Sequence, residues 1–180
     1  KKGKGILYYR LAMNYAPTSL TVDARSYGFS VERTYEGVED KEHVHKNKDG
    51  VWIVKSGELV RVTLKLTNTS YRYHVALVDY LPGGFEVVNE ELTNSPSISE
   101  KESARPSYWW WRNWYDHKNL RTERCECFCS YLYEGTHTFS YVCRATAAGE
   151  FVIPPAQAEE MYSPEIFGRT CSERVIIVRR

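Results

Sequence analysis

Five cysteines are the residues of this chain with the widest choice of chemistry, because thiols form disulfides, bind metals and act as nucleophiles. Cys125, Cys127 and Cys129 alternate with other residues, so in a β-strand all three would lie on one face, where neighbours are poorly placed to bridge each other. Cys143 follows a Glu134-Gly135 turn signal and could oppose Cys125 or Cys127 on a returning strand. No cysteine pair has the spacing of a zinc knuckle. We therefore predict that these cysteines act as small buried hydrophobic residues.

Motifs for other catalytic chemistry are missing from the sequence, which has no glycine-rich phosphate loop, nucleophile elbow or zinc-binding helix motif. His43 and His45 stand two apart in the charged stretch 36–50, where a solvated loop is much commoner than a metal pair. The histidines and carboxylates form no recognisable acid–base pair. The sequence therefore predicts no catalytic residue, no metal, no cofactor and no enzymatic activity.

The segment 154–169, PPAQAEEMYSPEIFGR, carries a different kind of candidate site. Its two leading prolines fix φ and lack backbone donors, so we expect it to leave any sheet as a stiff extended segment. A methionine and a tyrosine at the end of such a segment could plug a partner surface; by spacing alone, burial in the domain's own core is the favoured alternative. The candidate residues are Glu159, Glu160, Met161, Tyr162 and Pro164.

An aromatic run, YWWWRNWY at 108–115, follows a long polar stretch without periodicity at 89–107. Six aromatic residues in eight cannot all face one core, so the run indicates an interface with a neighbouring domain or a platform for stacking sugars. Complete coverage within the domain is an equally good interpretation. The interface candidates here are Trp109, Trp110, Trp111 and Trp114.

Composition is that of a folded domain, with 42% hydrophobic and 26% charged residues over 180 positions. A formal net charge of +1 gives no support for a polyanion partner. No apolar run approaches the roughly 20 residues that a membrane-spanning helix needs. Neither an initiator methionine nor a long apolar stretch is present at the start, so we expect an internal boundary of a longer protein and not a signal peptide.

Alternating hydrophobic residues predict many short β-strands. The clearest pattern is 58–67, with Val60, Val62, Leu64 and Leu66 on one face, and 72–80 is expected to pair with it across a turn at 68–70. Further strands are predicted at 6–15, 27–35, 51–54, 125–132, 137–147 and 174–178, with 115–120 and 125–132 forming a hairpin. The expected fold is mainly β: a single domain over 1–180 built as a two-sheet antiparallel β-sandwich, with room for one short helix near 106–114.

Several segments, taken in order, resemble the C-terminal, receptor-binding-like macroglobulin domain of bacterial α2-macroglobulin-like proteins. They are YYRLAMNYAPT at 8–18, FSVERTY at 29–35, YHVALVDYLPGGFEVVN at 73–89, WWWRNWYDH at 109–117, YVCRATAAGEF at 141–151 and the segment 154–169. The resemblance spans nearly the whole chain. It implies a β-sandwich, sometimes with a short helix, at the end of a large protein that traps proteases.

The resemblance also implies a role for Met161 and Tyr162, because related proteins place a Met-Tyr pair beside an internal thioester and so keep water from it. The thioester forms within a C-x-E-Q motif of a separate upstream domain. Cys171-Ser172-Glu173-Arg174 has the shape of that motif, but Arg174 has no carboxamide to acylate the cysteine, so this segment should form no thioester. With five cysteines, at least one thiol is free or pairs outside the chain.

The predicted function is that of a non-catalytic C-terminal domain of a bacterial α2-macroglobulin-like endopeptidase inhibitor, docked on the thioester domain and on neighbouring macroglobulin domains. Proteases are indirect partners, and neither nucleic acid nor membrane contacts this domain. The expected location is the periplasm, the cell envelope or the exterior, with the parent protein anchored through its N-terminus. The alternative is a carbohydrate-binding or adhesive sandwich that uses Trp109–Trp111.

Overall fold

The computed structural model describes residues 2–13, 18–19, 21–88 and 113–179. Within these residues nearly all regular structure is β-strand, and the one helical turn is the 3-10 turn η1 (Lys41–His43). The mainly-β prediction is confirmed. The strands are β1 (Arg25–Tyr27), β2 (Phe29–Gly37), β3 (Val44–Lys46), β4 (Trp52–Lys55), β5 (Leu59–Asn68), β6 (Arg72–Tyr80), β7 (Phe85–Val87), β8 (His117–Leu120), β9 (Arg124–Leu132), β10 (Gly135–Ala145), β11 (Gly149–Ile153), β12 (Gln157–Glu160), β13 (Ser163–Arg169) and β14 (Glu173–Val178).

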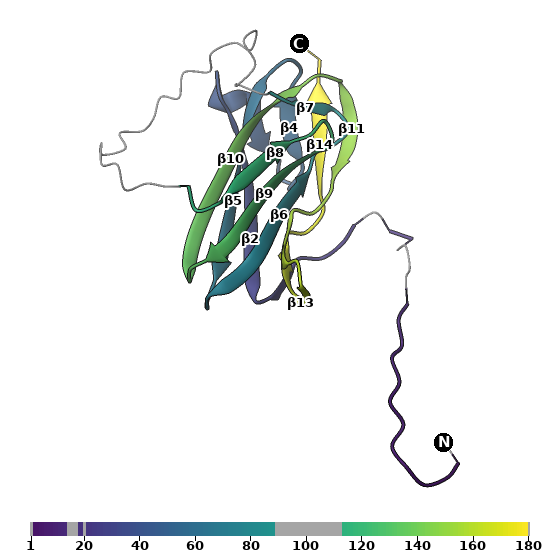
Figure 1. The fold of residues 1–180 in the computed structure, drawn as a ribbon. Coiled ribbons are helices and arrows are strands. Elements are labelled where there is room, and N and C mark those ends of the chain that lie inside the picture. The colour runs from purple at the N-terminus through teal and green to yellow at the C-terminus, as the bar shows by residue number, and fades with distance from the viewer. Residues whose placement is uncertain (1, 14–17, 20, 89–112, 180) are drawn as a thin grey trace.

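Two sheets form the sandwich (Figure 1). One has the strand order β1-β13-β12-β6-β9-β8 and the other the order β2-β5-β10-β7. The alternating residues of β5 explain the packing, because Val60, Val62, Leu64 and Leu66 are buried while the residues between them are partly or fully exposed. Burying one face of each sheet against the other removes these side chains from water, which is the main driving force for the fold.

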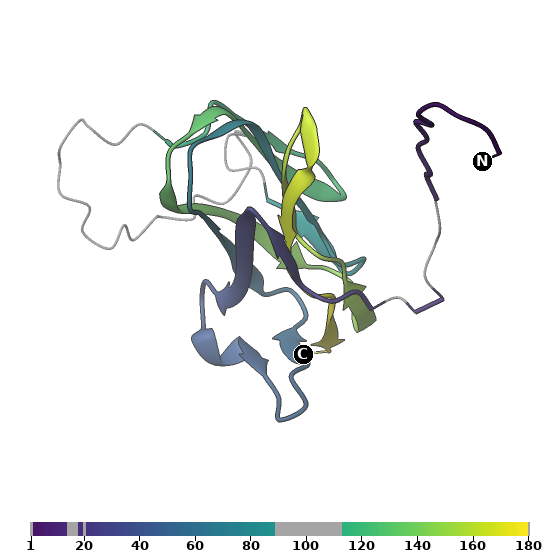
Figure 2. The same cartoon turned by 90° about the horizontal axis from the view of Figure 1, so that it is seen from below.

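A third sheet has the order β11-β14-β4-β3, and its β14 and β4 are parallel, unlike the antiparallel pairs that the sequence predicts. Strands β11 and β12 follow one another, as do β13 and β14, so a single long hairpin passes from one sheet into the other. The backbone amide of Thr170 donates to the carbonyl of Ala156 at 2.9 Å, and the Ala156 amide donates to the Thr170 hydroxyl at 3.0 Å, which keeps the two arms together at the crossing. The segment carrying η1, β3 and β4, blue in Figure 2, lies to one side of the teal and green strands.

The predicted pairing of β5 with β6 is wrong, and the opposition considered for Cys143 with Cys125 or Cys127 does not occur. The connection from β5 to β6 and that from β9 to β10 each cross from one sheet to the other. The crossings lie side by side: the Asn68 side-chain amide donates to the carbonyl oxygens of Ser70 and Tyr133, each at 2.8 Å. Cys143 is consequently in the opposite sheet from Cys125 and Cys127. The predicted hairpin of β8 and β9 is confirmed.

The structure describes residues 6–13 of the strand predicted at 6–15, and no strand forms there. Residues 6–13 belong to no strand, their side chains are exposed, and the segment lies apart from the sandwich (Figure 1). Alternation alone does not make a strand, because a strand also needs a partner for its backbone hydrogen bonds. Of the short helix allowed near 106–114, only Asn113 and Trp114 are described, and they are not helical.

Candidate functional site

Met161 and Tyr162, called here the Met-Tyr tip, form the turn between β12 and β13. The Met161 side chain is 50% exposed and that of Tyr162 is 80% exposed. Burial in the domain's own core, the alternative favoured by spacing, is therefore wrong. The extended segment does not leave the sheet, however, because β12 pairs with β13 on one side and with β6 on the other. The two prolines precede the strand, so their missing N–H groups interrupt none of its ladder.

His74 supports the tip from β6. Its carbonyl oxygen accepts a hydrogen bond from the backbone amide of Met161 at 2.9 Å, and its ring meets the ring of Tyr162 edge to face with a centroid distance of 5.2 Å. His74 has a φ of +50°, which is uncommon for a residue other than glycine. The tyrosine ring is thus held at one edge while most of its surface remains in solvent. The sequence pattern does not identify His74, since its role depends on an unusual backbone conformation.

The two acids before the tip are bonded within the domain. The Glu160 carboxylate accepts a hydrogen bond from the Tyr73 amide at 3.3 Å and lies 3.9 Å from the Arg72 guanidinium. Glu159 accepts a hydrogen bond from the Gln157 side chain at 2.8 Å. Pro164, beyond the tip, is exposed. What projects furthest at this end of the hairpin is therefore apolar and aromatic.

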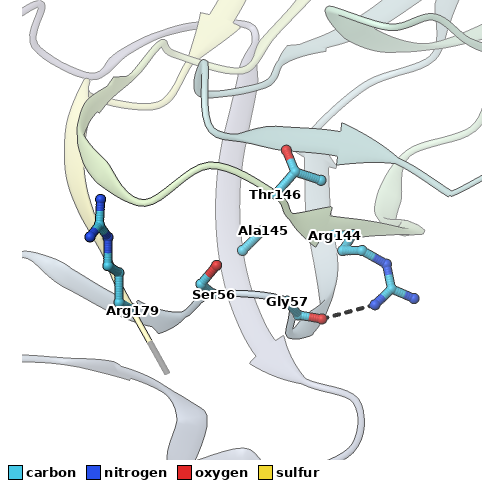
Figure 3. A pocket seen from close by; sticks show the side chains of 6 residues that line it. All are labelled: Ser56, Gly57, Arg144, Ala145, Thr146 and Arg179. Carbon is cyan, nitrogen blue, oxygen red and sulfur yellow. Dashed lines mark hydrogen bonds between the residues drawn. The ribbon is translucent and has the colours of Figure 1, made fainter.

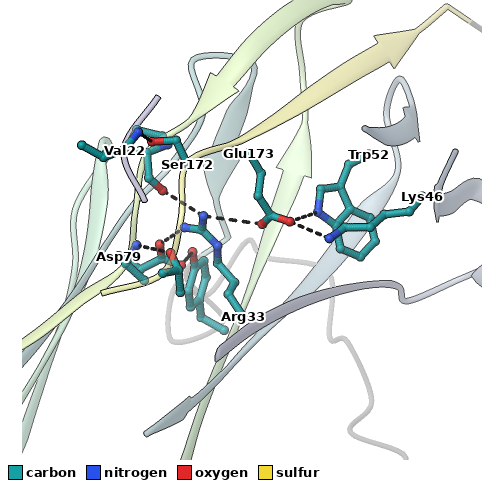
Figure 4. A network of polar contacts seen from close by, with 11 residues as sticks. Val22, Arg33, Lys46, Trp52, Asp79, Ser172 and Glu173 are labelled. Carbon is teal, nitrogen blue, oxygen red and sulfur yellow. Dashed lines mark hydrogen bonds and ion pairs between the residues drawn. The ribbon is translucent and has the colours of Figure 1, made fainter. Parts of the chain in front are cut away.

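Arg33 attaches the base of the hairpin to β2. Its side chain is 1% exposed, and it donates to the Asp79 carboxylate in β6 and, at 2.8 Å, to the carbonyl oxygen of Pro154 (Figure 4). The Tyr141 hydroxyl donates to the second Asp79 oxygen at 2.8 Å. Burial raises the pKa of the Asp79 carboxyl, whereas Arg33 and Tyr141 oppose that rise. Burial by itself lowers the pKa of Arg33, but the surrounding groups, Tyr35 and Asp79 first among them, raise it above its ordinary value.

The segment that resembles the C-x-E-Q motif belongs to this framework. Glu173 accepts hydrogen bonds from Lys46 at 2.6 Å and from the Trp52 indole at 3.3 Å, and its second oxygen lies 3.9 Å from Arg33 (Figure 4). Arg174 pairs with Glu150 on the neighbouring strand. Glu173 thus connects β14 to β2, β3 and β4, a structural role, whereas the Arg174–Glu150 pair is exposed.

A close backbone approach also positions the hairpin. A Cβ atom at Gly168 would lie 2.2 Å from the carbonyl oxygen of Phe29, so only glycine lets β13 pass this near to β2. The tip therefore stands on a base held by one buried ion pair and one close backbone contact.

Of the four tryptophans proposed as interface residues, the structure describes one. Trp109, Trp110 and Trp111 lie outside the described residues. Trp114 is partly buried against the core, its indole N–H donates to the Thr138 carbonyl at 2.8 Å, and its ring meets that of Tyr115 edge to face. Trp114 is therefore anchored within the domain and offers no free stacking platform.

The prediction of buried cysteines is confirmed for Cys125, Cys127 and Cys129 in β9 and for Cys143 in β10, and it is wrong for Cys171, which lies at the surface; these four are also free. Burial raises the pKa of all four thiols, so they remain protonated and unreactive at neutral pH. Cys171 is exposed and also free. Among the described residues no three His, Cys, Asp or Glu side chains are grouped so that they could hold a metal ion.

A depression of about 470 Å³ lies at the far end of β10, lined by Ser56, Gly57, Arg144, Ala145, Thr146 and Arg179 (Figure 3). The Arg144 guanidinium donates to the Gly57 carbonyl at 2.9 Å, and Arg179 lies on the other side of the 56–57 turn. The two arginines do not converge, so the depression has no evident binding chemistry. No helix among the described residues is long and apolar enough to cross a membrane.

Known proteins similar to this chain include α2-macroglobulins and one protein with a different name. Residues 28–165 match the model of the bacterial α2-macroglobulin MG10 domain. The chain is 37% identical over 98% of its length to "Circularly permutated Ras protein 2" of Dictyostelium discoideum, covering 4% of that protein. It is 24% identical over 98% of its length to the α2-macroglobulin homolog of Nostoc sp., covering 9% of it.

Among solved structures, Escherichia coli α2-macroglobulin activated by porcine elastase is similar with a TM-score of 0.68 and 25% identity, over 88% of this chain and 14% of that one. The chain thus spans only a small part of the proteins that it resembles.

Proposed function

Since the chain belongs to the bacterial α2-macroglobulin family, we propose that it is a non-catalytic, C-terminal macroglobulin-like domain whose Met-Tyr tip covers the thioester of an adjoining module. In this proposal residues 1–180 form a single domain of a much longer protein. The parent protein traps proteases and lies in the periplasm or cell envelope.

The observation that carries the proposal is the exposure of Met161 and Tyr162 at the end of a fixed hairpin. A thioester is lost when water reaches it, so a cover must be apolar, shaped to the site and presented outward. Methionine adapts to an irregular surface, and tyrosine adds a rigid ring with a polar end. Exposing apolar side chains of this size to water is unfavourable in the isolated domain. Contact with a partner would bury them and remove that cost.

The way the hairpin is held supports the same role. The buried Arg33–Asp79 pair and the close approach of Gly168 fix the base, so the tip cannot swing away by itself. A cover of this kind is released when two modules move apart as rigid bodies, without unfolding of either. Proteolysis elsewhere in the parent protein would drive that movement.

The test uses the full-length parent protein and its reaction with methylamine. The double variant Met161→Ala/Tyr162→Ala should react at least about tenfold faster, the factor that corresponds to 1.4 kcal/mol of lost protection. The matched control is Tyr80→Ala, which removes an exposed tyrosine of β6 that is not part of the tip. An unchanged rate in the double variant, or a parent protein that consumes no methylamine even after denaturation, would refute the proposal.

The sequence alternative, a sugar-binding module, receives no support from the described aromatic residue of the run, Trp114. Its residues Trp109–Trp111 lie outside the described part of the chain, and Trp114 is bonded within the domain.

A further inference from the structure

Four exposed tyrosines meet where the two sheet-crossing connections lie side by side. Tyr71 and Tyr73 stand at the start of β6, and Tyr131 and Tyr133 stand at the end of β9. Their exposed fractions run from 40% for Tyr71 to 68% for Tyr133. We call these four residues the tyrosine cluster. The sequence pattern does not reveal it, because the two pairs are about 60 positions apart and meet only through the pairing of β6 with β9.

The rings of the cluster contact one another edge to face. Tyr71 lies 5.1 Å from both Tyr73 and Tyr133 by ring centroid, and Tyr73 lies 5.8 Å from Tyr131, with interplanar angles from 64° to 88°. Partial burial, the neighbouring hydroxyls and a hydrogen bond with Tyr133 raise the pKa of Tyr71. The four rings are therefore in contact with one another and form one surface.

The cluster is continuous with the Met-Tyr tip. The amide of Tyr73 donates to Glu160, the residue before the tip, and His74, the residue after Tyr73, contacts both Met161 and Tyr162. The tip, the start of β6 and the end of β9 are thus neighbours, joined by Glu160 and His74. A surface of this composition on one side of a domain is typical of a protein–protein contact.

Ring orientation favours one of two kinds of partner. A sugar stacks on a broad open ring face, whereas rings that meet at 64° to 88° place an edge against a neighbour's face and so occupy part of the ring-face area of the cluster. Edges and hydroxyls fit a polypeptide surface, which offers apolar side chains and backbone carbonyls. The α2-macroglobulin relatives supply such a surface within the same polypeptide, because this chain covers only 9% of the Nostoc protein.

We propose that the tyrosine cluster is the main docking surface of the domain and binds the module of the same polypeptide over which the Met-Tyr tip lies. The inference rests on the proposed function for the identity of that module. It adds a division of roles: the cluster supplies the contact area, and the tip supplies the cover.

The test is photo-cross-linking in the full-length protein, with p-benzoylphenylalanine placed at Tyr131. The expected product is an intramolecular cross-link, mapped by mass spectrometry, between position 131 and a segment outside residues 1–180. The control carries the same photo-reactive residue at Tyr80, an exposed position of β6 outside the cluster, and should give at most one fifth of that yield. Cross-links from 131 that stay within residues 1–180, that join two molecules, or that do not exceed the control would overturn the proposal.

A second readout keeps the two proposals separate. Faster methylamine reaction of the tip variant without a cross-link at 131 refutes the docking role of the cluster and leaves the cover standing. A cross-link at 131 with an unchanged methylamine rate in the tip variant refutes the cover and leaves the docking surface standing.

Discussion

The guanidinium of Arg33 donates a hydrogen bond to the carbonyl oxygen of Pro154, 2.8 Å away, and so fixes the tip-bearing hairpin where it leaves the third sheet after β11. The same guanidinium is paired with Asp79, which lies in β6 beside the hairpin. Two sheets and the base of the hairpin therefore depend on one buried side chain.

Removal of Arg33 should destabilise the domain strongly. Arg33→Met leaves the Asp79 carboxylate buried without its cationic partner, and the expected loss in the free energy of unfolding is about 3–5 kcal/mol. Urea unfolding of the chain measures it. Lys65→Met is the control, because Lys65 and Glu32 form an exposed pair at 3.4 Å that is worth about 0–1 kcal/mol. Equal effects of the two substitutions would contradict a supporting role for Arg33.

The loss in the free energy of unfolding caused by Arg33→Met should become smaller as the pH falls. Burial already raises the pKa of Asp79, and loss of Arg33 removes the main influence that opposes the rise. A carboxyl whose pKa is higher in the folded state than in the unfolded state destabilises the fold above its folded pKa, and the penalty disappears as pH falls below the unfolded value. The difference in unfolding free energy between Arg33→Met and the unchanged chain should therefore be smaller at pH 4 than at pH 8. A difference that grows on acidification would be inconsistent with this cause.

Changes at the tip should leave stability almost untouched. Met161→Ala and Tyr162→Ala remove exposed side chains, so each should alter the free energy of unfolding by no more than about 0.5 kcal/mol. Leu77→Ala in the core should by contrast cost about 2–5 kcal/mol. A loss above 2 kcal/mol at either tip position would show that the tip serves the domain's own fold and not a partner.

Gly168→Ala should destabilise the domain by about 1–3 kcal/mol, because the added Cβ would overlap the Phe29 carbonyl and push β13 away from β2. Gly83→Ala provides the comparison, since a Cβ there meets only Phe151, at an ordinary 3.4 Å. Thermal unfolding of both variants is the measurement. If Gly168→Ala were as stable as Gly83→Ala, the close approach would be dispensable.

One cysteine should react with an alkylating reagent in the native protein, and the other four should not. In the native protein N-ethylmaleimide should modify Cys171, which is exposed, and spare Cys125, Cys127, Cys129 and Cys143, whose burial blocks access and raises the thiol pKa. Peptide mapping by mass spectrometry after labelling at pH 7 and at pH 9 measures this. Labelling in urea should modify all five, and rapid native labelling of any of the four would contradict their burial.

Much of the local structure was predictable from the sequence. Alternation identified β5 and β2, because side-chain direction in a strand repeats every two residues whatever its partners are. Alternation at 6–13 was no less regular, yet no strand forms there. Pairing requires a partner strand, and periodicity carries no information about one.

The sequence by itself determined a mainly-β chain, the class of buried residues, the absence of a carboxamide at Arg174 and the residues of the tip. Only the tertiary structure decided that β5 and β6 lie in different sheets, that Arg33 reaches Asp79 and Pro154, that the tip faces solvent and that four tyrosines meet beside it. The reason is physical: strand direction is a local property of the backbone, whereas sheet partners are chosen by long-range hydrogen bonds and packing between segments as far apart as residues 33 and 154.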